Sequence, residues 1–580
     1  MTQDRFAPKL GRIRDTRQAR AERHAALVFR QAGRQGTRAL RQNGHVAPGA
    51  LTRGMGTGLR AAAGLIAPGG RRVIVKARYT RIVGGDLGAA RAHIKYILRD
   101  GVTREGKPGR LYDASGEEVQ SAAFLDRSAD DPHQFRLVVS ADEGAQLADL
   151  KQFVRDLLAQ MERDLDTKLD WVAVDHFNTG HPHTHIVIRG KDDQGKDLVM
   201  ARDYIAHGVR ARAQSLVTLE LGPETELERM QKLFNEVGQE RLTRLDRALI
   251  GRSKDNILVV TAGDELDPAR HTLRVGRLKT LERLGLAEER QQGVWALDSQ
   301  METKLRQLGE RADKFKMMQR ALREAGIERS AAALALFERG PRKDPLVGKV
   351  VGVGLVDEIS DSTWVVLDAV DGRVHYAELG RLKPAEVPQR ETLVALAGGG
   401  LDGKPSRVAK LQELSPVDVS HQVDYDGPTW LDQAILTKWR PEPGMPGFAS
   451  EVREAIAARA RWLTSRNLAT VSPTGRVDPV PDMMRTLRQS ENERLTQGMS
   501  HVLGATYVPA DPGARVVGIY DRAVTTPTGK VAVIRREDTF TMAPWRPALE
   551  PFRGQSVVGV IGPSRVTWTL DRGRTLPART

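Results

Sequence analysis

The distribution of apolar residues between positions 71 and 222 predicts a mixed fold of short strands and amphipathic helices. Apolar residues form alternating or β-branched runs where strands are expected, and they recur every three or four residues where helices are expected. The longest predicted helix carries one apolar stripe, formed by Leu147, Leu150, Phe153, Leu157 and Met161. The predicted order is strand, helix, strand, helix, strand, strand, helix, at residues 71–83, 84–101, 135–140, 143–165, 170–177, 184–190 and 200–219.

A short loop, Asn-Thr-Gly-His-Pro, separates the last two predicted strands. A connection of this length joins antiparallel strands, because parallel strands need a long crossover. We therefore expect a mainly antiparallel sheet. The predicted fold class for this region is α+β, with the helices covering one face of the sheet.

The pattern changes after residue 222, and a chain of 580 residues is too long for one hydrophobic core. Residues 270–298 predict a winged-helix-like unit, in which a turn and a Gly-Val-Trp strand follow a helix with inward-facing Leu273, Leu278, Leu281 and Leu284. An ordinary helix and hairpin is the alternative, and a winged helix can bind protein instead of DNA. Residues 346–379 alternate with period 2 between turn signals, which is typical of a small β-barrel.

These patterns divide the chain into five predicted segments. They are a basic, mostly disordered arm, an α+β domain, a helical region with the winged-helix-like unit, a small β-barrel-like domain and an α+β C-terminal domain, at residues 1–70, 71–223, 224–340, 341–415 and 416–580.

Charge is concentrated at the beginning of the chain. Residues 1–76 contain 16 Lys and Arg against three acidic residues, which accounts for +13 of the net charge of +15. Basic arms of this kind bind polyanions by releasing counterions, so we expect contact with nucleic acid; a solubilising tail is the alternative. The chain has no cysteine, which excludes disulfides, thiol nucleophiles and thiolate metal sites. No apolar run has the length of a transmembrane helix, so we expect no membrane insertion.

Four histidines occur within ten residues, in the sequence DHFNTGHPHTHIVIRG that begins at Asp175. Residues two apart on a strand share a face, so His183 and His185 project together. His176 ends the preceding strand and can meet them across the loop, whereas His181 lies within that loop. Three neutral imidazole nitrogens can hold a divalent ion and leave coordination positions open for chemistry. The alternative is that these histidines fill the core or the surface. Imidazole ligands alone do not select between zinc, iron, nickel, manganese and magnesium.

A hydrolytic metal site usually includes a carboxylate, and none is expected on this face. Asp175 neighbours His176 but points the other way by strand alternation, while Asn178 shares the parity of His176. We consider both as second-sphere partners. Without a carboxylate ligand, the metal is expected to polarise a phosphate for a side-chain nucleophile.

The candidate nucleophile is Tyr96, in the helix predicted after the first strand. It lies one turn beyond His93 and among three cations, Arg91, Lys95 and Arg99. A phenol has an ordinary pKa of about 10, so it needs a cation or base nearby to ionise. A half-buried helix aromatic is the alternative reading of Tyr96, and Tyr79, Tyr112 and Tyr204 compete for the role.

Taken together, HIKYILRDG, HQFRLVVS, LDWVAVDHFNTGHPHTHIVIRG and ARDYIAHGVRARAQSLVTLELGP resemble the conjugative relaxases of the HUH endonuclease superfamily, and within it the P-type mobilisation class. The resemblance covers residues 73–222. One departure is Thr184, where the family places a large hydrophobic residue. The sequences YDGPTWLDQ and FTMAPWRPALE resemble the extended C-terminal region of uncharacterised function found on some relaxases.

This resemblance implies site- and strand-specific nicking and rejoining of DNA at an origin of transfer. A divalent ion, Mg²⁺ or Mn²⁺, on His176, His183 and His185 would grip the scissile phosphate. Tyr96 would attack it and form a 5′-phosphotyrosine intermediate. Further residues expected to bind the DNA strand are Arg136, Arg202, Arg210 and Arg212; a solvated basic face is the alternative.

The implied partners are single-stranded origin DNA, accessory relaxosome proteins and the coupling protein of a type IV secretion system. The implied role is to start conjugative transfer of a plasmid or an integrative element. The implied location is the bacterial cytoplasm, with export of the protein bound to the transferred strand. Three alternatives stay open: a rolling-circle replication initiator with the same chemistry, a catalytically inert DNA-binding or structural protein, and a metal-dependent hydrolase of small phosphates.

Overall fold

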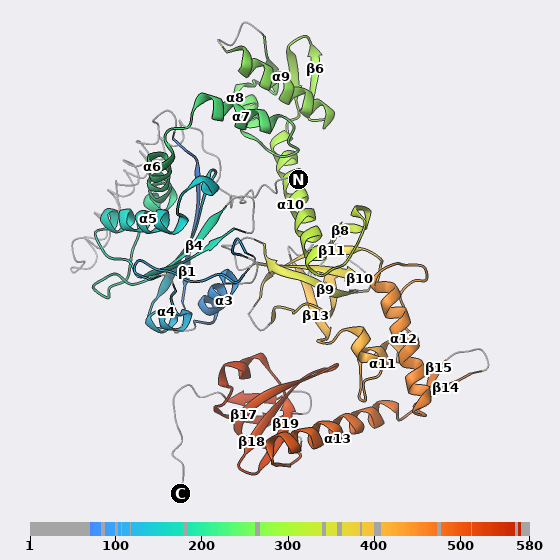
Figure 1. Cartoon of the computed structure of the whole chain (residues 1–580). Helices are drawn as coiled ribbons and strands as arrows, with labels where there is room; N and C mark the ends of the chain where they lie inside the picture. The colour runs from blue at the N-terminus through green and yellow to red at the C-terminus, as the bar shows by residue number, and fades with distance from the viewer. Residues whose placement is uncertain are drawn as a thin grey trace, which may run out of the picture. The chain divides into compact units, whose positions relative to one another are not determined.

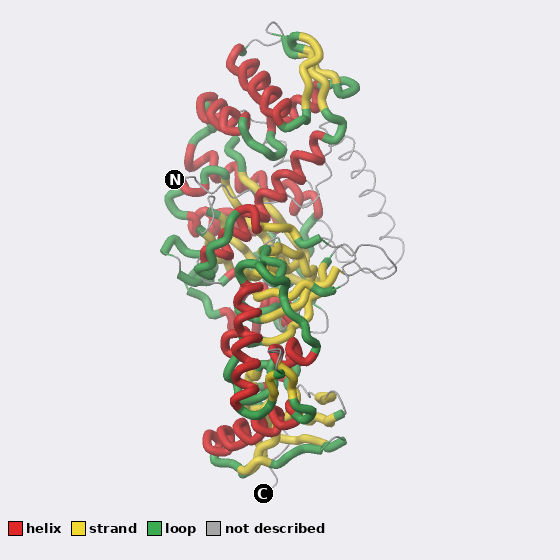
Figure 2. The backbone as a smooth tube through the Cα atoms, turned by 90° about the vertical axis from the view of Figure 1, so that its right-hand side faces the viewer, coloured by secondary structure: helices red, strands yellow, loops and turns green. Residues whose placement is uncertain are grey.

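The computed structural model describes residues 70–569, with gaps at 83–86, 99–101, 106, 117, 178–181, 262–266, 339–343, 357–361, 383–385, 399–407, 473–476, 512 and 563–565. The described residues up to 309 form one compact unit, and those from 310 onward form a second (Figure 1). Both units contain helices and strands (Figure 2), which confirms the expected α+β, multidomain class. The basic arm predicted for residues 1–70 lies, up to residue 69, outside the described residues.

The first unit begins with a four-stranded antiparallel sheet of order β1-β2-β4-β3. Strands β3 and β4, which follow each other in the chain, pair directly and antiparallel, as the short loop between them predicts. The elements of this region are β1 (Val73–Arg81), α3 (Gly88–Ile97), α4 (Ser121–Arg127), β2 (His133–Ala141), α5 (Leu150–Leu165), β3 (Trp171–His176), β4 (His183–Arg189) and α6 (Val209–Leu221).

Helices cover both faces of this sheet, so the expectation of helices on one face is wrong. Helices α5 and α6 pack with Ile186 and Ile188 on one face. On the other face, α3 and α4 pack with Val172 and Val187. Because β3 and β4 carry apolar side chains at both parities, each face must be covered to remove them from water.

Helix α5 shows how the local sequence sets an element. Its N-cap is Asp149, whose carboxylate accepts hydrogen bonds from the backbone N–H groups of Lys151 and Gln152. Its C-cap is Asp166, which adopts the left-handed conformation. Four residues of the predicted apolar stripe lie buried within the helix: Leu150, Phe153, Leu157 and Met161.

The rest of the first unit is a helical region followed by a three-stranded sheet of order β5-β7-β6. Helix α9 precedes the β6–β7 hairpin, and the two pack around the buried Trp295. This is the helix-and-hairpin order predicted for residues 270–298. The elements are α7 (Glu226–Val237), α8 (Arg244–Arg252), β5 (Ile257–Val259), α9 (Pro268–Arg283), β6 (Ala287–Gln291), β7 (Val294–Leu297) and α10 (Met301–Glu324), the last of which continues into the second unit.

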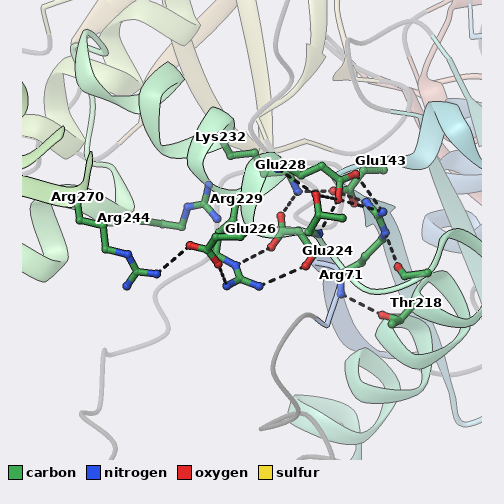
Figure 3. Close-up of polar contacts among 12 residues, drawn as sticks. Arg71, Glu143, Thr218, Glu224, Glu226, Glu228, Arg229, Lys232, Arg244 and Arg270 are labelled. Carbon is green, nitrogen blue, oxygen red and sulfur yellow. Dashed lines mark hydrogen bonds and ion pairs between the residues drawn. The ribbon is translucent and has the colours of Figure 1, made fainter. Parts of the chain in front are cut away.

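A charged cluster ties α7 to the four-stranded sheet (Figure 3). Arg71, which is 4% exposed, lies 3.4 Å from Glu143 and 3.1 Å from Glu228. Lys232 of α7 forms ion pairs with both Glu143 and Glu224. The cluster therefore joins the start of β1, the turn after β2 and the first two turns of α7.

The second unit contains two six-stranded sheets. The first has the order β13-β12-β9-β10-β11-β8, and the second the order β16-β19-β18-β17-β20-β21. The elements are β8 (Leu334–Leu336), β9 (Leu346–Leu355), β10 (Ser362–Ala369), β11 (Val374–Arg381), β12 (Leu393–Gly398), β13 (Ala409–Ser415), α11 (Trp430–Leu436), α12 (Phe448–Ser465), β14 (Ala469–Val471), β15 (Val477–Pro479), α13 (Met483–Leu503), β16 (Thr506–Tyr507), β17 (Arg515–Thr526), β18 (Gly529–Arg536), β19 (Thr539–Pro544), β20 (Ser556–Ile561) and β21 (Val566–Thr569).

Neither sheet closes among the strands that the structure describes, so the predicted β-barrels are corrected to open sheets. In each sheet one short strand pairs in parallel at an edge, β8 with β11 and β16 with β19. Period-2 alternation is equally compatible with an open sheet and a barrel, because closure depends on the pairing of strands far apart in the chain.

Candidate metal centre

The three candidate ligands meet where β3 ends and β4 begins. His176 is paired directly opposite His183, and His185 lies two residues further along the same strand. Residues opposite each other in an antiparallel pair share a face, as do residues two apart. The three imidazoles therefore share the face covered by α3, which is the arrangement that the H-x6-H-x-H spacing predicts.

The imidazoles are close together and withdrawn from solvent. One nitrogen of each ring lies within 4.8 Å of a nitrogen of the other two. His176, His183 and His185 are 0%, 0% and 1% exposed. Their ring centroids are 4.3 to 5.3 Å apart. Three nitrogen donors at this separation can converge on one divalent ion.

The backbone of α3 orients one of these rings. The Nε2 atom of His176 lies 2.7 Å from the carbonyl oxygen of Ile97. A carbonyl only accepts, so Nε2 carries the proton and donates, which leaves Nδ1 as the ligand atom. Hydrogen bonds of this kind fix the tautomer and orientation of metal-binding histidines. Sequence spacing could not reveal this contact, because the acceptor is a backbone atom 79 residues away.

A fourth histidine, His93 on α3, adjoins the cluster. It is 5% exposed, and its ring centroid lies 6.5 Å from that of His185. From the sequence, His93 was predicted only to lie one helical turn before Tyr96, with no role at the metal site. The available signal was its place three residues before that tyrosine, on the apolar side of a predicted helix.

Tyr96 lies on the same helix, next to Ile97 and one turn after His93. Its side chain is half-buried against the apolar cluster of Ile94 and Val174 between α3 and the sheet. The helix that carries Tyr96 is thus fastened to the histidine cluster through Ile97.

The three competing tyrosines of this region lie on the opposite face of the sheet. Tyr112 and Tyr204 belong to the core formed with α5 and α6, and Tyr79 shares its strand face with Val75. Tyr112 donates to Asp175 over 2.8 Å, and Tyr204 donates to Asp164 over 2.8 Å. Burial and the adjacent carboxylate raise the pKa of both phenols, so neither is prepared to ionise.

The carboxylate considered as a second-sphere partner faces away from the histidines. Asp175 accepts hydrogen bonds from Tyr112 and from Thr184, the latter over 2.6 Å. Burial raises the pKa of its carboxyl group. Asp175 therefore braces the strand pair from behind instead of orienting a ligand, which corrects that expectation. Asn178 and His181 lie outside the described residues.

The candidate DNA-binding cations separate into two groups. Arg91, Lys95 and Arg202 are exposed, Arg210 is half-buried, and Arg99 lies outside the described residues. Arg136 is only 1% exposed and faces the side chain of Gln134 within the sheet. Arg212 forms an ion pair with Asp164 at 2.7 Å. Arg136 is therefore buried inside the domain, which corrects its assignment to DNA binding, whereas the assignment of Arg212, whose side chain is 34% exposed, stays a prediction.

No described helix combines the length and the apolar character needed to cross a lipid bilayer.

Comparison with known proteins matches the chain to one family, described as "Protein of unknown function (DUF3363)", over residues 274–406 and 399–577. The two matched stretches together span more than half of the chain. They begin after the histidine cluster. No curated protein and no solved structure matches the chain.

Proposed function

We propose that this chain, which belongs to the DUF3363 family of proteins of unknown function, is a DNA relaxase that nicks and rejoins one strand at an origin of transfer. The observation that carries the proposal is the convergence of two features on one face of the sheet. Three buried imidazoles lie within 4.8 Å of one another. The helix that carries Tyr96 is hydrogen-bonded to one of them through Ile97.

The donor set fits a divalent metal ion. His176 through Nδ1, together with His183 and His185, would supply three neutral nitrogens and leave further coordination positions open. We propose Mg²⁺ or Mn²⁺, which when bound would polarise the scissile phosphate and stabilise the charge that develops on it. Among the described residues no carboxylate joins the histidine cluster, so the arrangement favours attack by a protein side chain over attack by an activated water.

The proposed reaction exchanges one phosphodiester bond for another. The phenol oxygen of Tyr96 forms a bond to the phosphorus, and the bond from phosphorus to the 3′ oxygen breaks. The phenol proton ends on the released 3′-hydroxyl group. The product is a protein joined to the 5′ end of the strand. The reverse attack by the 3′-hydroxyl restores the strand and the free tyrosine, so no nucleotide triphosphate is consumed.

The partners proposed for this activity follow from it. They are single-stranded origin DNA, accessory relaxosome proteins and the coupling protein of a type IV secretion system. Exposed Arg91 and Lys95 on α3 lie on the helix of the nucleophile, where they would hold the strand backbone. The proposed setting is the bacterial cytoplasm, from which the protein leaves attached to the transferred strand of a plasmid or integrative element.

The test is to identify the covalent bond between the protein and the DNA. Full-length protein is incubated with Mg²⁺ or Mn²⁺ and a supercoiled plasmid carrying the origin. Protease and nuclease digestion then yields the modified peptide for mass spectrometry. We expect a phosphotyrosine linkage at Tyr96, none in Tyr96→Phe, and full linkage in the control Tyr79→Phe, which alters the opposite face. A linkage at another residue, or nicking that leaves no adduct, would contradict the proposal.

A further inference from the structure

Two segments, one in each compact unit, repeat the same sequence features. Thr-x-Leu-Asp-x-Ala occurs at residues 243–248 and again at 429–434. An arginine, a second cation two residues later and a Leu-Ala pair recur at residues 277–287 and 459–469. A methionine follows the arginine by 24 residues in both segments, from 277 to 301 and from 459 to 483. We call residues 243–305 the first module and residues 429–487 the second module.

The repeated residues of the first module form one buried network. The side chain of Thr243 caps α8 in a capping box with Asp246. The Nε atom of Arg277 donates to Asp246 over 2.7 Å, and Nη2 donates to the same carboxylate over 2.8 Å. The same guanidinium also donates to the backbone carbonyls of Val237 and Arg241, each over 3.0 Å.

The second module contains the same network at the equivalent residues. Thr429 caps α11 in a capping box with Asp432. Arg459 donates to that carboxylate through Nε over 2.8 Å and through Nη2 over 2.9 Å. It also donates to the carbonyls of Tyr425 over 2.6 Å and Gly427 over 2.8 Å. In both modules the arginine and the aspartate are 0% exposed.

The modules also share their order of elements. In each, a short capped helix precedes a longer helix, a hairpin and a final helix. In each module the longer helix is followed by its C-cap and then by a residue with a positive φ. This residue is Gly285 (68°) in the first module and Asn467 (58°) in the second. The final helix buries Met301 and Leu305 in one core and Met483 and Leu487 in the other. A fully buried ion pair is costly to desolvate, so its recurrence at matching positions indicates duplication of one module.

A groove opens in the second module between α12 and its hairpin. It has a volume of about 550 Å³. Small side chains of α12 form its floor, among them Ala457, Thr464 and Ser465, and Val471 of β14 forms one wall. Arg440 and Arg461 also line the groove, and no acidic residue does among those that the structure describes. Figure 1 shows the hairpin of β14 and β15 following the C-terminal end of α12.

The charge on the outer face differs between the two modules at an equivalent position. Lys279 lies two residues after the buried arginine of the first module, and it pairs with Glu282 at 3.2 Å and Glu289 at 2.8 Å. Arg461 occupies the same position in the second module. Within the part of the chain that the structure describes, neither Arg461 nor Arg440 forms an ion pair. The cation at this position is therefore neutralised in the first module and unneutralised in the second, where Arg440 adds another cation at the groove.

We propose that this groove of the second module binds the sugar–phosphate backbone of duplex DNA. A helix followed by a hairpin is the arrangement with which winged-helix proteins contact a duplex. Small side chains let the backbone approach α12 closely, and the hydroxyl groups of Thr464 and Ser465 can donate to phosphate oxygens. Arg440 and Arg461 supply charge-assisted contacts to phosphates. This binding is separate from the proposed nicking and requires neither the histidines nor Tyr96.

The experiment measures binding of the full-length protein to a blunt-ended duplex of about 20 base pairs and random sequence, by fluorescence anisotropy in EDTA. EDTA removes metal, so the nicking reaction does not contribute. The variant Ala457→Glu places a negative charge in the groove, and Ala457→Gln has the same shape without the charge. Ala457 is exposed, so both variants should fold, which circular dichroism verifies. We expect Ala457→Glu to bind the duplex about tenfold more weakly than Ala457→Gln.

The salt dependence provides an independent measurement. Each phosphate contact contributes about 0.9 to the slope of log K against log salt, so Arg440→Ala/Arg461→Ala should lower the slope by about 1.8. The control Arg485→Ala/Arg488→Ala makes the same change in charge on α13, outside the groove, and should leave the slope unchanged. The proposal is overturned if Ala457→Glu binds as well as Ala457→Gln, or if both arginine pairs lower the slope equally.

Discussion

At the scale of single residues, the site depends on three imidazoles and on the atoms that hold them in place. Strand pairing sets His176 opposite His183, and alternation adds His185. The Ile97 carbonyl holds the first ring in one tautomer over 2.7 Å. The same alternation places Asp175 and Thr184 behind the strands, where they bond to each other. One face of the strand pair therefore carries the three candidate ligands, and the other carries the hydrogen bonds that brace the strands.

The choice of three histidines out of four can be tested by single substitutions. Removal of a second-sphere partner typically lowers metal affinity by roughly 10- to 100-fold. Removal of a ligand itself should lower the affinity by more than this. We therefore expect His176→Ala, His183→Ala and His185→Ala each to weaken Mn²⁺ binding by over about 100-fold and to abolish adduct formation. His181→Ala should change both by only a few-fold. Calorimetry measures the affinity, and gel shift of the covalent complex measures the adduct.

A loss for His181→Ala as large as that for His176→Ala would show that the loop histidine is a ligand. In that event it would be wrong to set His181 aside on the ground that Gly180 and Pro182 place it in the loop between the strands.

At the scale of elements, helices are fastened to the first sheet by polar contacts as well as by apolar burial. Helix α7 has no buried residue of its own, yet its charged side chains reach the sheet. Lys232 pairs with Glu143 and with Glu224. Burial lowers the pKa of Lys232, but its bonds to these two carboxylates outweigh burial and raise the pKa overall. The position of α7 thus depends on charge, as Figure 3 illustrates.

Because ion pairs hold α7 against the sheet, we expect acid to weaken its attachment. Hydrogen bonds from the backbone and side chain of Thr225, and then from Arg71, lower the pKa of Glu228 to about 2 from an ordinary value of 4.5. A carboxyl group with a depressed pKa stabilises the folded state above its ordinary pKa, and this stabilisation is lost as the pH falls toward the depressed value. We expect the protection of α7 against hydrogen exchange, corrected for intrinsic rates, to fall between about pH 4.5 and pH 2.

The matched variant is Glu228→Gln, which keeps the size of the side chain and removes the charge. Its α7 should be less protected at neutral pH and should lack this part of the pH dependence. Equal pH profiles in the two proteins would mean that Glu228 does not hold the helix.

At the scale of the whole molecule, positive charge is distributed along the chain in separate places. Residues 1–76 carry +13 of the net +15. The second module adds Arg440 and Arg461 at its groove. Sites of this kind act additively on a polyanion, because each contact releases counterions. The family match to residues 274–577 therefore covers a region with a proposed DNA contact of its own, beyond the histidine site.

The basic arm can be tested by replacement. If residues 1–70 are exchanged for a neutral Gly/Ser segment of equal length, binding to duplex DNA should weaken and its salt slope should become shallower, because fewer counterions are released. Adduct formation on a short single-stranded substrate should persist. Anisotropy at several salt concentrations measures the slope. An unchanged slope would show that the arm does not contact DNA.

The sequence by itself determined the features that depend on local backbone geometry. Strand alternation predicted that His176, His183 and His185 share a face, and the short loop predicted that their strands are antiparallel; both are confirmed. The apolar stripe of α5 and the helix followed by a hairpin near residue 290 were predicted for the same reason. Periods of two and 3.6 residues are properties of the chain over a few residues, so they can be read without knowing the fold.

Only the tertiary structure decided which residues meet over long separations. It placed helices on both faces of the first sheet, left the two six-stranded sheets open, and buried Arg136 while pairing Arg212 with Asp164. It also brought Ile97 to His176 across 79 residues. A charged side chain looks the same in sequence whether it meets solvent, a carboxylate or a phosphate. Its partner is set by the packing of distant segments, and that packing determined which cations stay exposed to solvent.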